Sequence, residues 1–159
     1  MSSLEVREFP ALRLASMRYT GTFFGPGIAM TWARFGSWAG ARGLMLPEVR
    51  MLGISLDNPQ LTPAALCRYD CAIVVDESFQ PDAEVEIQTF PGGRYACVPF
   101  KGTAMEMGAA WMKLFSQDLP QAGLSAVAAL PFELYTGLHT VDPATGRITC
   151  LLCAGVAPK

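Results

Sequence analysis

The 159-residue chain has few charged side chains, and this shortage excludes one class of protein. Charged residues make up 16% of the chain, against ~25% in an average domain, whereas apolar residues make up 51%. This balance excludes an intrinsically disordered chain, which needs low hydrophobicity and high net charge. The length suits one hydrophobic core, so we expect residues 1–159 to form a single domain.

Clusters of basic residues are also missing. No two of the twelve Lys and Arg residues are adjacent, and fourteen Asp and Glu residues give a formal net charge of −2. Nucleic-acid binding needs clustered positive charge, which releases counterions from the phosphates. We therefore expect no direct nucleic-acid partner.

Long apolar runs are absent too. No segment supplies the ~20 predominantly apolar residues of a membrane span, and the first seven residues lack the apolar stretch of a signal peptide. We expect a cytoplasmic protein that does not enter a membrane.

The chain has few residues that could bind a metal ion or act in nucleophilic catalysis. The only histidine, His139, falls in an expected loop and gives weak support for a Ser-His or Cys-His site. Cys67 and Cys71, together with the C-x-x-C pair Cys150 and Cys153, could be taken for zinc ligands. However, Cys150 and Cys153 lie in an apolar run typical of a strand, where residues three apart point to opposite faces. We expect reduced, buried thiols and neither metal nor cofactor.

A diverged internal repeat runs through the chain. The segment FPALRLA at 9–15 recurs as FPGGRYA at 90–96, an offset of 81 residues, and Trp32 matches Trp111 at an offset of 79. Ordered matches with so little drift indicate two half-domains, at about 4–80 and 81–157. Units of this length are too long for a solenoid repeat, so we expect them to pack about a pseudo-twofold axis.

Both halves show the same order of expected elements. Hydrophobic periodicity and turn residues predict two helices, at 27–42 and 104–119. They also predict strands at 12–19, 51–56, 66–75, 84–90, 94–100, 132–136 and 147–156. We predict an α+β fold in which two β-α-β-β units form antiparallel sheets, with two main helices around a central groove.

Glu133 is the charged residue with the most unusual surroundings. It is the only charge between positions 121 and 140, and the strand period puts it on one face with Tyr135. The repeat puts Ser55 at its counterpart position. Burying a carboxylate without a partner is expensive. A cationic ligand is one possible partner; a solvated edge position or an ion pair with a distant arginine is the alternative.

Aromatic residues could complete a binding site. Trp32 and Trp111 occupy equivalent positions on the two expected helices, and Phe24, Phe115 and Tyr135 accompany them. Aromatic faces attract cations, with each contact worth ~0.5–2 kcal/mol. For any one of these residues alone, ordinary core packing is the alternative.

Together, these motifs resemble the GyrI-like effector-binding domain family. The most specific matches are PGGRYA at 91–96 and FELY at 132–135, and the resemblance covers about residues 4–156. The family comprises ligand-binding modules of multidrug-responsive bacterial transcription activators and a stand-alone gyrase-inhibitory protein. The first expected strand begins within a dozen residues of Met1, so we expect a stand-alone module.

The resemblance implies a groove between the halves that binds amphipathic or cationic aromatic compounds. It implies that Glu133 supplies the negative charge. The expected lining residues are Trp111, Phe115, Tyr135, Trp32, Ile28 and Phe24.

Two other functions stay open at this stage. Some proteins that resemble the family hydrolyse reactive natural products, and Glu133 would then act as general base with assistance from Tyr135. A gyrase-inhibitor-like role would require a protein partner instead. The sequence does not identify the ligand, and it leaves both a monomer and a homodimer open.

Overall fold

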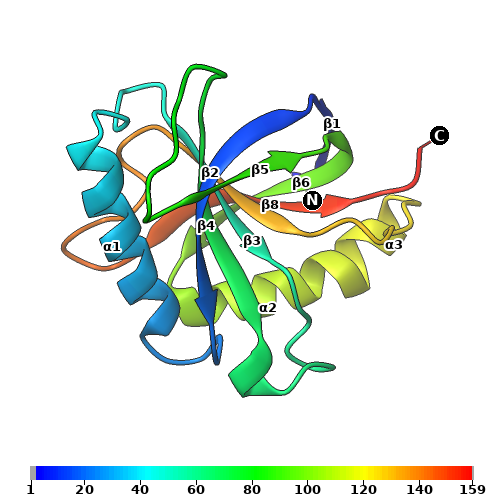
Figure 1. The fold of residues 1–159 in the computed structure, drawn as a ribbon. Coiled ribbons are helices and arrows are strands. Elements are labelled where there is room, and N and C mark those ends of the chain that lie inside the picture. The colour runs from blue at the N-terminus through cyan, green and yellow to red at the C-terminus, as the bar shows by residue number, and fades with distance from the viewer. Residues whose placement is uncertain (1–2, 159) are drawn as a thin grey trace.

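A computed structural model describes residues 3–158 and contains one eight-stranded antiparallel sheet (Figure 1). The strands are arranged in the order β1-β6-β8-β7-β3-β4-β2-β5. Their bounds are β1 (Glu5–Phe9), β2 (Leu12–Thr20), β3 (Arg50–Ser55), β4 (Arg68–Val74), β5 (Glu86–Phe90), β6 (Gly93–Gly102), β7 (Phe132–Thr136) and β8 (Ile148–Gly155). The helical segments are α1 (Gly27–Ala41), the 3₁₀ turn η1 (Ala64–Leu66), α2 (Ala104–Lys113), the π-helical η2 (Leu114–Asp118) and α3 (Leu119–Gln121). The α+β fold predicted from the sequence is confirmed.

The strand pairing follows the repeat. Strands β1 to β4 belong to the first half and β5 to β8 to the second. If each strand is replaced by its equivalent in the other half (β1 by β5, β2 by β6, β3 by β7, β4 by β8, and the reverse), the strand order of the sheet is the same order read from its other end. Phe9 lies opposite Gly93 in the β1–β6 ladder, and Leu12 lies opposite Phe90 in the β2–β5 ladder. An offset of 81 residues converts the first pair into the second. The halves meet in the middle of the sheet, where β3 pairs with β7.

The central pairing corrects one sequence expectation. The sequence repeat puts Ser55 at the position equivalent to Glu133, but the ladders put Gly53 there. Gly53 pairs with Cys71 in the β3–β4 ladder, and Glu133 pairs with Leu152, 81 residues after Cys71, in the β7–β8 ladder; Ser55 pairs with Tyr69. The error amounts to two residues. Because side chains alternate with a period of two, such a slip keeps the same face and escapes detection by periodicity.

Both helices cover the same face of the sheet, which we call the helix face. Helix α1 packs against β2 and β4, and α2 packs against β6. Phe35 and Ala39 of α1 and Met107 of α2 are buried in one hydrophobic cluster with residues of this face. Helix α2 begins with a capping box, in which the Thr103 hydroxyl accepts from the Glu106 N–H and the Glu106 carboxylate accepts from the Thr103 N–H.

The opposite face, called the outer face here, has its own apolar cluster because the sheet curls. The rings of Phe9 in β1 and Phe90 in β5 are 6.1 Å apart, although these strands are the two ends of the sheet. Phe132 lies 5.5 Å from Phe9 and 5.2 Å from Phe90. Gly92 has a φ of +79°, and a Cβ there would lie 2.5 Å from the Phe9 carbonyl oxygen, so the tight turn before β6 requires glycine.

Two local features were missed. Strand β1 was not predicted, because it is a short edge strand with charged residues and pairs only with β6. The helix expected at 104–119 ends as α2 at Lys113 and continues as a π-helical turn.

Among residues 3–158, no helix is long and apolar enough to cross a membrane.

Candidate functional site

Glu133 lies in the centre of the sheet on the helix face. Strand β7 has β3 on one side and β8 on the other, and Glu133 is only 4% exposed. None of the ion pairs found between residues 3–158 includes this carboxylate. The alternatives of a solvated edge residue and of an ion pair with a distant arginine are therefore wrong for this structure.

Two tyrosines donate hydrogen bonds to the same oxygen of Glu133. The Tyr69 hydroxyl lies 2.6 Å from Oε1, and the Tyr135 hydroxyl lies 3.1 Å from it. The Tyr69 hydroxyl in turn accepts a hydrogen bond from Trp32 Nε1 at 3.0 Å. These neutral donors stabilise the carboxylate without cancelling its charge.

The contact between Tyr69 and Glu133 depends on the strand that separates them. Tyr69 is on β4 and Glu133 on β7, with β3 in between. The residue of β3 beneath the contact is Gly53, where a Cβ would overlap the Tyr69 hydroxyl and lie 2.6 Å from Glu133 Oε1. Glycine inside a strand often marks a close approach of this kind, so Gly53 was the available sequence signal for Tyr69.

Aromatic rings cover the carboxylate from the helix side. The Trp32 ring of α1 meets the Tyr135 ring at 5.4 Å and the Tyr69 ring at 6.3 Å, both edge to face. Phe23 meets the Tyr69 ring at 6.1 Å. Edge-to-face pairs are the favoured geometry for packed aromatic residues. Because Glu133 beside them is only 4% exposed, the carboxylate is enclosed in this conformation.

Burial controls the ionisation of this group. Desolvation raises the pKa of Glu133 from 4.5 to about 7, although the hydrogen bonds from Tyr69 and Tyr135 act in the opposite direction. Burial, reinforced by the charge of Glu133, raises the pKa of both tyrosines well above their usual value. It also raises the pKa of the nearby Cys150 thiol to about 12. The carboxylate therefore exchanges its proton near neutral pH while these neighbours stay uncharged.

The structure brings together only some of the expected lining residues. Tyr135 and Trp32 contact one another beside Glu133, and Ile28 packs against the same helix-face cluster. Trp111 and Phe115 stack on each other at 6.1 Å, with Phe115 42% exposed. Phe24 is 77% exposed. The participation of Trp111, Phe115 and Phe24 in the site stays a prediction.

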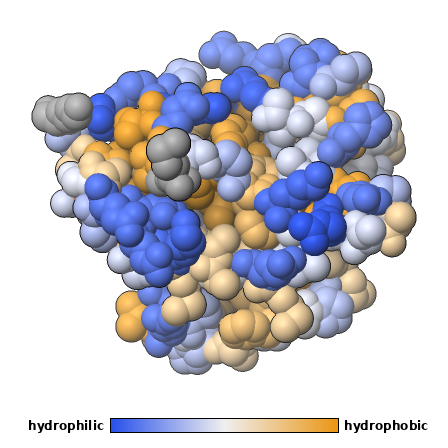
Figure 2. Space-filling view, turned by 180° about the vertical axis from the view of Figure 1, so that it is seen from behind, coloured by the Kyte–Doolittle hydropathy of each residue, from blue (hydrophilic) through white to orange (hydrophobic). Residues whose placement is uncertain are grey.

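Two recesses of the surface lie away from Glu133. One, of about 480 Å³, is lined by residues of β6, β7 and β8, including Leu134 and Leu151. A smaller one, of about 120 Å³, lies beside Lys113 and Asp118. Neither is lined by Glu133. Figure 2 shows that apolar surface is also exposed in the middle of one face, between hydrophilic side chains.

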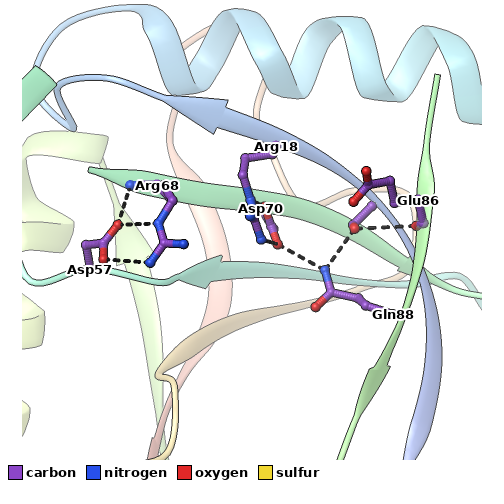
Figure 3. Close-up of polar contacts among 7 residues, drawn as sticks. Arg18, Asp57, Arg68, Asp70, Glu86 and Gln88 are labelled. Carbon is purple, nitrogen blue, oxygen red and sulfur yellow. Dashed lines mark hydrogen bonds and ion pairs between the residues drawn. The ribbon is translucent and has the colours of Figure 1, made fainter. Parts of the chain in front are cut away.

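A second buried carboxylate, Asp70, lies on the outer face of β4 (Figure 3). Arg18 donates to both of its oxygens, at 2.8 and 3.0 Å. Gln88 Nε2 donates to Asp70 at 3.0 Å and to Ser16 at 2.8 Å. Asp70 and Tyr69 are neighbours in β4, so one strand carries the ion-paired carboxylate on one face and a donor to Glu133 on the other.

The duplicated antiparallel sheet with two helices on one face defines the fold class of this chain, and comparison with known proteins identifies its family. The family profile of the GyrI-like small molecule binding domain matches residues 3–152, and the chain belongs to this family.

Two relatives illustrate its range. The SPbeta prophage-derived putative transcriptional regulator YosT of Bacillus subtilis is 32% identical over 114 residues, which cover 72% of this chain and 76% of that protein. A DNA gyrase inhibitor of Yersinia enterocolitica is 28% identical over 94 residues, which cover 57% of this chain and 60% of that protein.

Solved structures share the fold. The EcmrR C-terminal domain superposes with a TM-score of 0.74 at 13% identity, covering 100% of this chain and 99% of that one. SAV2435, solved with bound tetraphenylphosphonium, gives 0.55 at 16% identity, with 98% and 94% coverage. A hydrolase from Listeria innocua gives 0.60 at 10% identity, with 97% and 91% coverage.

Proposed function

We propose that this chain binds a cationic aromatic compound and that Glu133 is the charge partner of the cation. The observation that carries the proposal is a carboxylate that is 4% exposed and has no cationic partner among the described residues. Burying an ionised carboxylate alone is unfavourable, so a cation in contact with it would satisfy a group that the chain itself leaves unpaired.

The expected energies are sufficient for useful binding. A cation ~4 Å from a carboxylate gains roughly 4 kcal/mol at an effective dielectric constant near 20, before desolvation costs. Contacts with the faces of Trp32, Tyr69 and Tyr135 would each add ~0.5–2 kcal/mol. Together these terms approach the roughly −8 kcal/mol of a micromolar complex. The tetraphenylphosphonium bound to SAV2435, which has the same fold, is a cation of this class.

Ligand entry would require a rearrangement of the aromatic cover. The Trp32 side chain of α1 donates a 3.0 Å hydrogen bond from its Nε1 to the Tyr69 hydroxyl, which in turn donates to Glu133. A ligand that reaches Glu133 would have to displace this indole. Binding should therefore change the tryptophan fluorescence. The binding site at Glu133 would be the same whether the protein sequesters the compound or senses it.

The experiment uses two ligands that differ mainly in charge. Methyltriphenylphosphonium is a cation, and triphenylphosphine oxide is a neutral compound of nearly the same size and shape. Wild-type protein and Glu133→Gln are titrated with both, and binding is followed by tryptophan fluorescence and calorimetry. The variant should lose at least tenfold in affinity for the cation and little for the neutral compound.

A matched control separates this loss from a general effect of charge. Glu86→Gln removes an exposed carboxylate on the outer face, and it should leave both affinities unchanged. Equal losses for the two ligands in Glu133→Gln would refute the electrostatic role of Glu133. Saturable binding of neither ligand to wild-type protein would refute the proposed ligand class.

The pKa of Glu133 also favours a second candidate, a hydrolase. A general base works best with a pKa near the working pH, and burial raises the pKa of Glu133 to about 7, with Tyr135 3.1 Å away as a possible proton donor. An aromatic epoxide tests this candidate. Catalytic turnover that disappears in Glu133→Gln while binding persists would establish it, whereas binding without turnover would exclude it for that substrate.

A third candidate, contact with a protein partner, is favoured by the similarity to the DNA gyrase inhibitor of Yersinia enterocolitica. A supercoiling assay with purified gyrase tests it directly. Inhibition at stoichiometric protein would support this role, and an absence of inhibition at a large excess would exclude gyrase as the partner.

A further inference from the structure

Two cysteines outside the Glu133 site face each other across a strand pair. Cys97 of β6 and Cys153 of β8 are directly opposite in the antiparallel ladder. Both belong to the outer-face cluster and are 1% and 0% exposed. Directly opposite residues on one face of such a ladder have Cβ atoms ~4.5–5.5 Å apart, and a disulfide needs ~3.5–4.5 Å. A small strand adjustment would bring the two sulfur atoms within bonding distance.

The two thiols already interact with each other. The Cys97 thiol donates to the Tyr95 carbonyl oxygen at 4.0 Å and the Cys153 thiol to the Leu151 carbonyl oxygen at 3.9 Å. Interaction between the two sulfur groups lowers the pKa of Cys97 and raises that of Cys153, so ionisation of one thiol is assisted by the other. The guanidinium of Arg7, on the neighbouring edge strand β1, acts in the same direction on Cys97. Burial opposes ionisation of Cys97, but the effects of Cys153 and Arg7 outweigh it, so the pKa of Cys97 is lowered. The thiolate is the form that reacts with oxidants, so this arrangement favours reaction at the pair.

The other cysteines are placed differently. Cys71 lies opposite Gly53 and Met17, and Cys150 lies opposite Phe100, so neither faces another cysteine in the described ladders. Burial raises the pKa of the Cys71 and Cys150 thiols, which keeps them protonated. Cys67 precedes β4 and lies outside the ladders.

We propose that Cys97 and Cys153 are a redox-active pair that a peroxide converts into a cross-strand disulfide. The Cys97 thiolate would attack one peroxide oxygen and break the O–O bond; with hydrogen peroxide and one proton, the products are the Cys97 sulfenic acid and water. The Cys153 sulfur would then attack the Cys97 sulfur, and its proton would leave with the sulfenic hydroxyl as a second water. In sum, two thiols and one hydrogen peroxide give one disulfide and two waters.

The bond would tie together strands that support the Glu133 site. Cys153 also lies opposite Phe132 in the β7–β8 ladder, and the next pair of that ladder is Glu133 with Leu152. A Cys97–Cys153 disulfide would link β6 covalently to the strand that flanks Glu133. Because it would close a loop of more than a third of the chain, the oxidised protein should unfold several degrees higher than the reduced protein.

Peptide mapping of the folded wild-type chain tests the proposal. The protein is treated with excess hydrogen peroxide under native conditions, free thiols are then alkylated in denaturant, and the digest is analysed without reduction. We expect a linked peptide that contains Cys97 and Cys153, with a mass two hydrogens below the sum of the free peptides. Cys67, Cys71 and Cys150 should be recovered alkylated.

The variants sharpen the result. Cys97→Ser and Cys153→Ser should each abolish the linked peptide, whereas Cys150→Ser should retain it. The proposal is overturned if Cys97 and Cys153 are both recovered alkylated, or if the bond that forms joins a different pair. Because the mapping uses wild-type protein, this decision does not depend on whether a variant folds.

Discussion

The two faces of β4 contact two buried carboxylates that differ in their partners: one is paired with an arginine, and the other accepts hydrogen bonds from neutral tyrosines. On the outer face, Asp70 is 2% exposed and receives two hydrogen bonds from Arg18. On the helix face, Tyr69 donates to Glu133, which is 4% exposed and forms no ion pair with any residue between 3 and 158. A structural carboxylate is neutralised within the chain. A carboxylate without such a partner has a raised pKa instead, and under the proposed function its partner is the cation of the ligand.

Sequence reasoning predicted one side of this comparison better than the other. Glu133 stood out because it is the only charge in a long apolar stretch, and its partner Tyr135 followed from the strand period. Tyr69 lies 64 residues away, and only the placement of β3 between β4 and β7 brings it to Glu133. The pair of Arg18 and Asp70 spans 52 residues and likewise depends on the β2–β4 register.

The fold was more predictable than the site for the same physical reason. Hydrophobic periodicity and turn residues are local, and they identified both main helices and every strand except β1, whose charges and edge position hide its pattern. The repeat revealed the two equivalent halves but gave Ser55, not Gly53, as the position equivalent to Glu133. Contacts across several strands are not encoded in any local window, so the site required the three-dimensional structure.

The largest expected effect concerns the pH dependence of stability. Glu133 has a pKa of about 7 in the folded state and about 4.5 when unfolded, so between these values the folded state holds a proton that the unfolded state has lost. Its contribution to stability is complete below pH 4.5 and is lost as the pH rises through 7. The loss amounts to about 3 kcal/mol.

Urea unfolding of wild type and Glu133→Gln from pH 5 to pH 8 measures this effect. The free energy of unfolding of the wild type should fall relative to that of the variant as the pH rises. If the two pH profiles run parallel, Glu133 does not carry the unpaired charge that distinguishes it from Asp70.

A smaller effect is expected where the internal ion pair is broken. Arg18→Ala leaves Asp70 buried with only Gln88 as donor, and it should destabilise the protein by about 2 kcal/mol. This figure lies below the range for fully buried pairs because the Arg18 side chain is 46% exposed and water screens it.

The control for Arg18→Ala is Arg68→Ala, which breaks the more exposed pair with Asp57. Chemical unfolding at pH 7 should show a clearly smaller loss for this control. Equal losses in both variants would mean that burial of Asp70 does not set the strength of its pairing.

The smallest effect distinguishes the two tyrosine donors. Tyr69→Phe removes the 2.6 Å hydrogen bond, and it should raise the pKa of Glu133 by about one pH unit, equivalent to about 1.4 kcal/mol. Tyr135→Phe removes the 3.1 Å bond and should have a smaller effect. The midpoint of the pH-dependent stability change, referenced to Glu133→Gln, measures both. A larger shift in Tyr135→Phe would contradict the geometry of the site.

The most direct test of the central claim is the pH dependence of ligand affinity. If methyltriphenylphosphonium binds the ionised form of Glu133, its affinity for wild-type protein should be about tenfold weaker at pH 6 than at pH 8, because the pKa of the carboxyl is about 7. Triphenylphosphine oxide should gain nothing from the rise in pH, and Glu133→Gln should lose the dependence for the cation. A cation affinity that is the same at both pH values in wild-type protein would contradict the claim that Glu133 is the charge partner of the ligand.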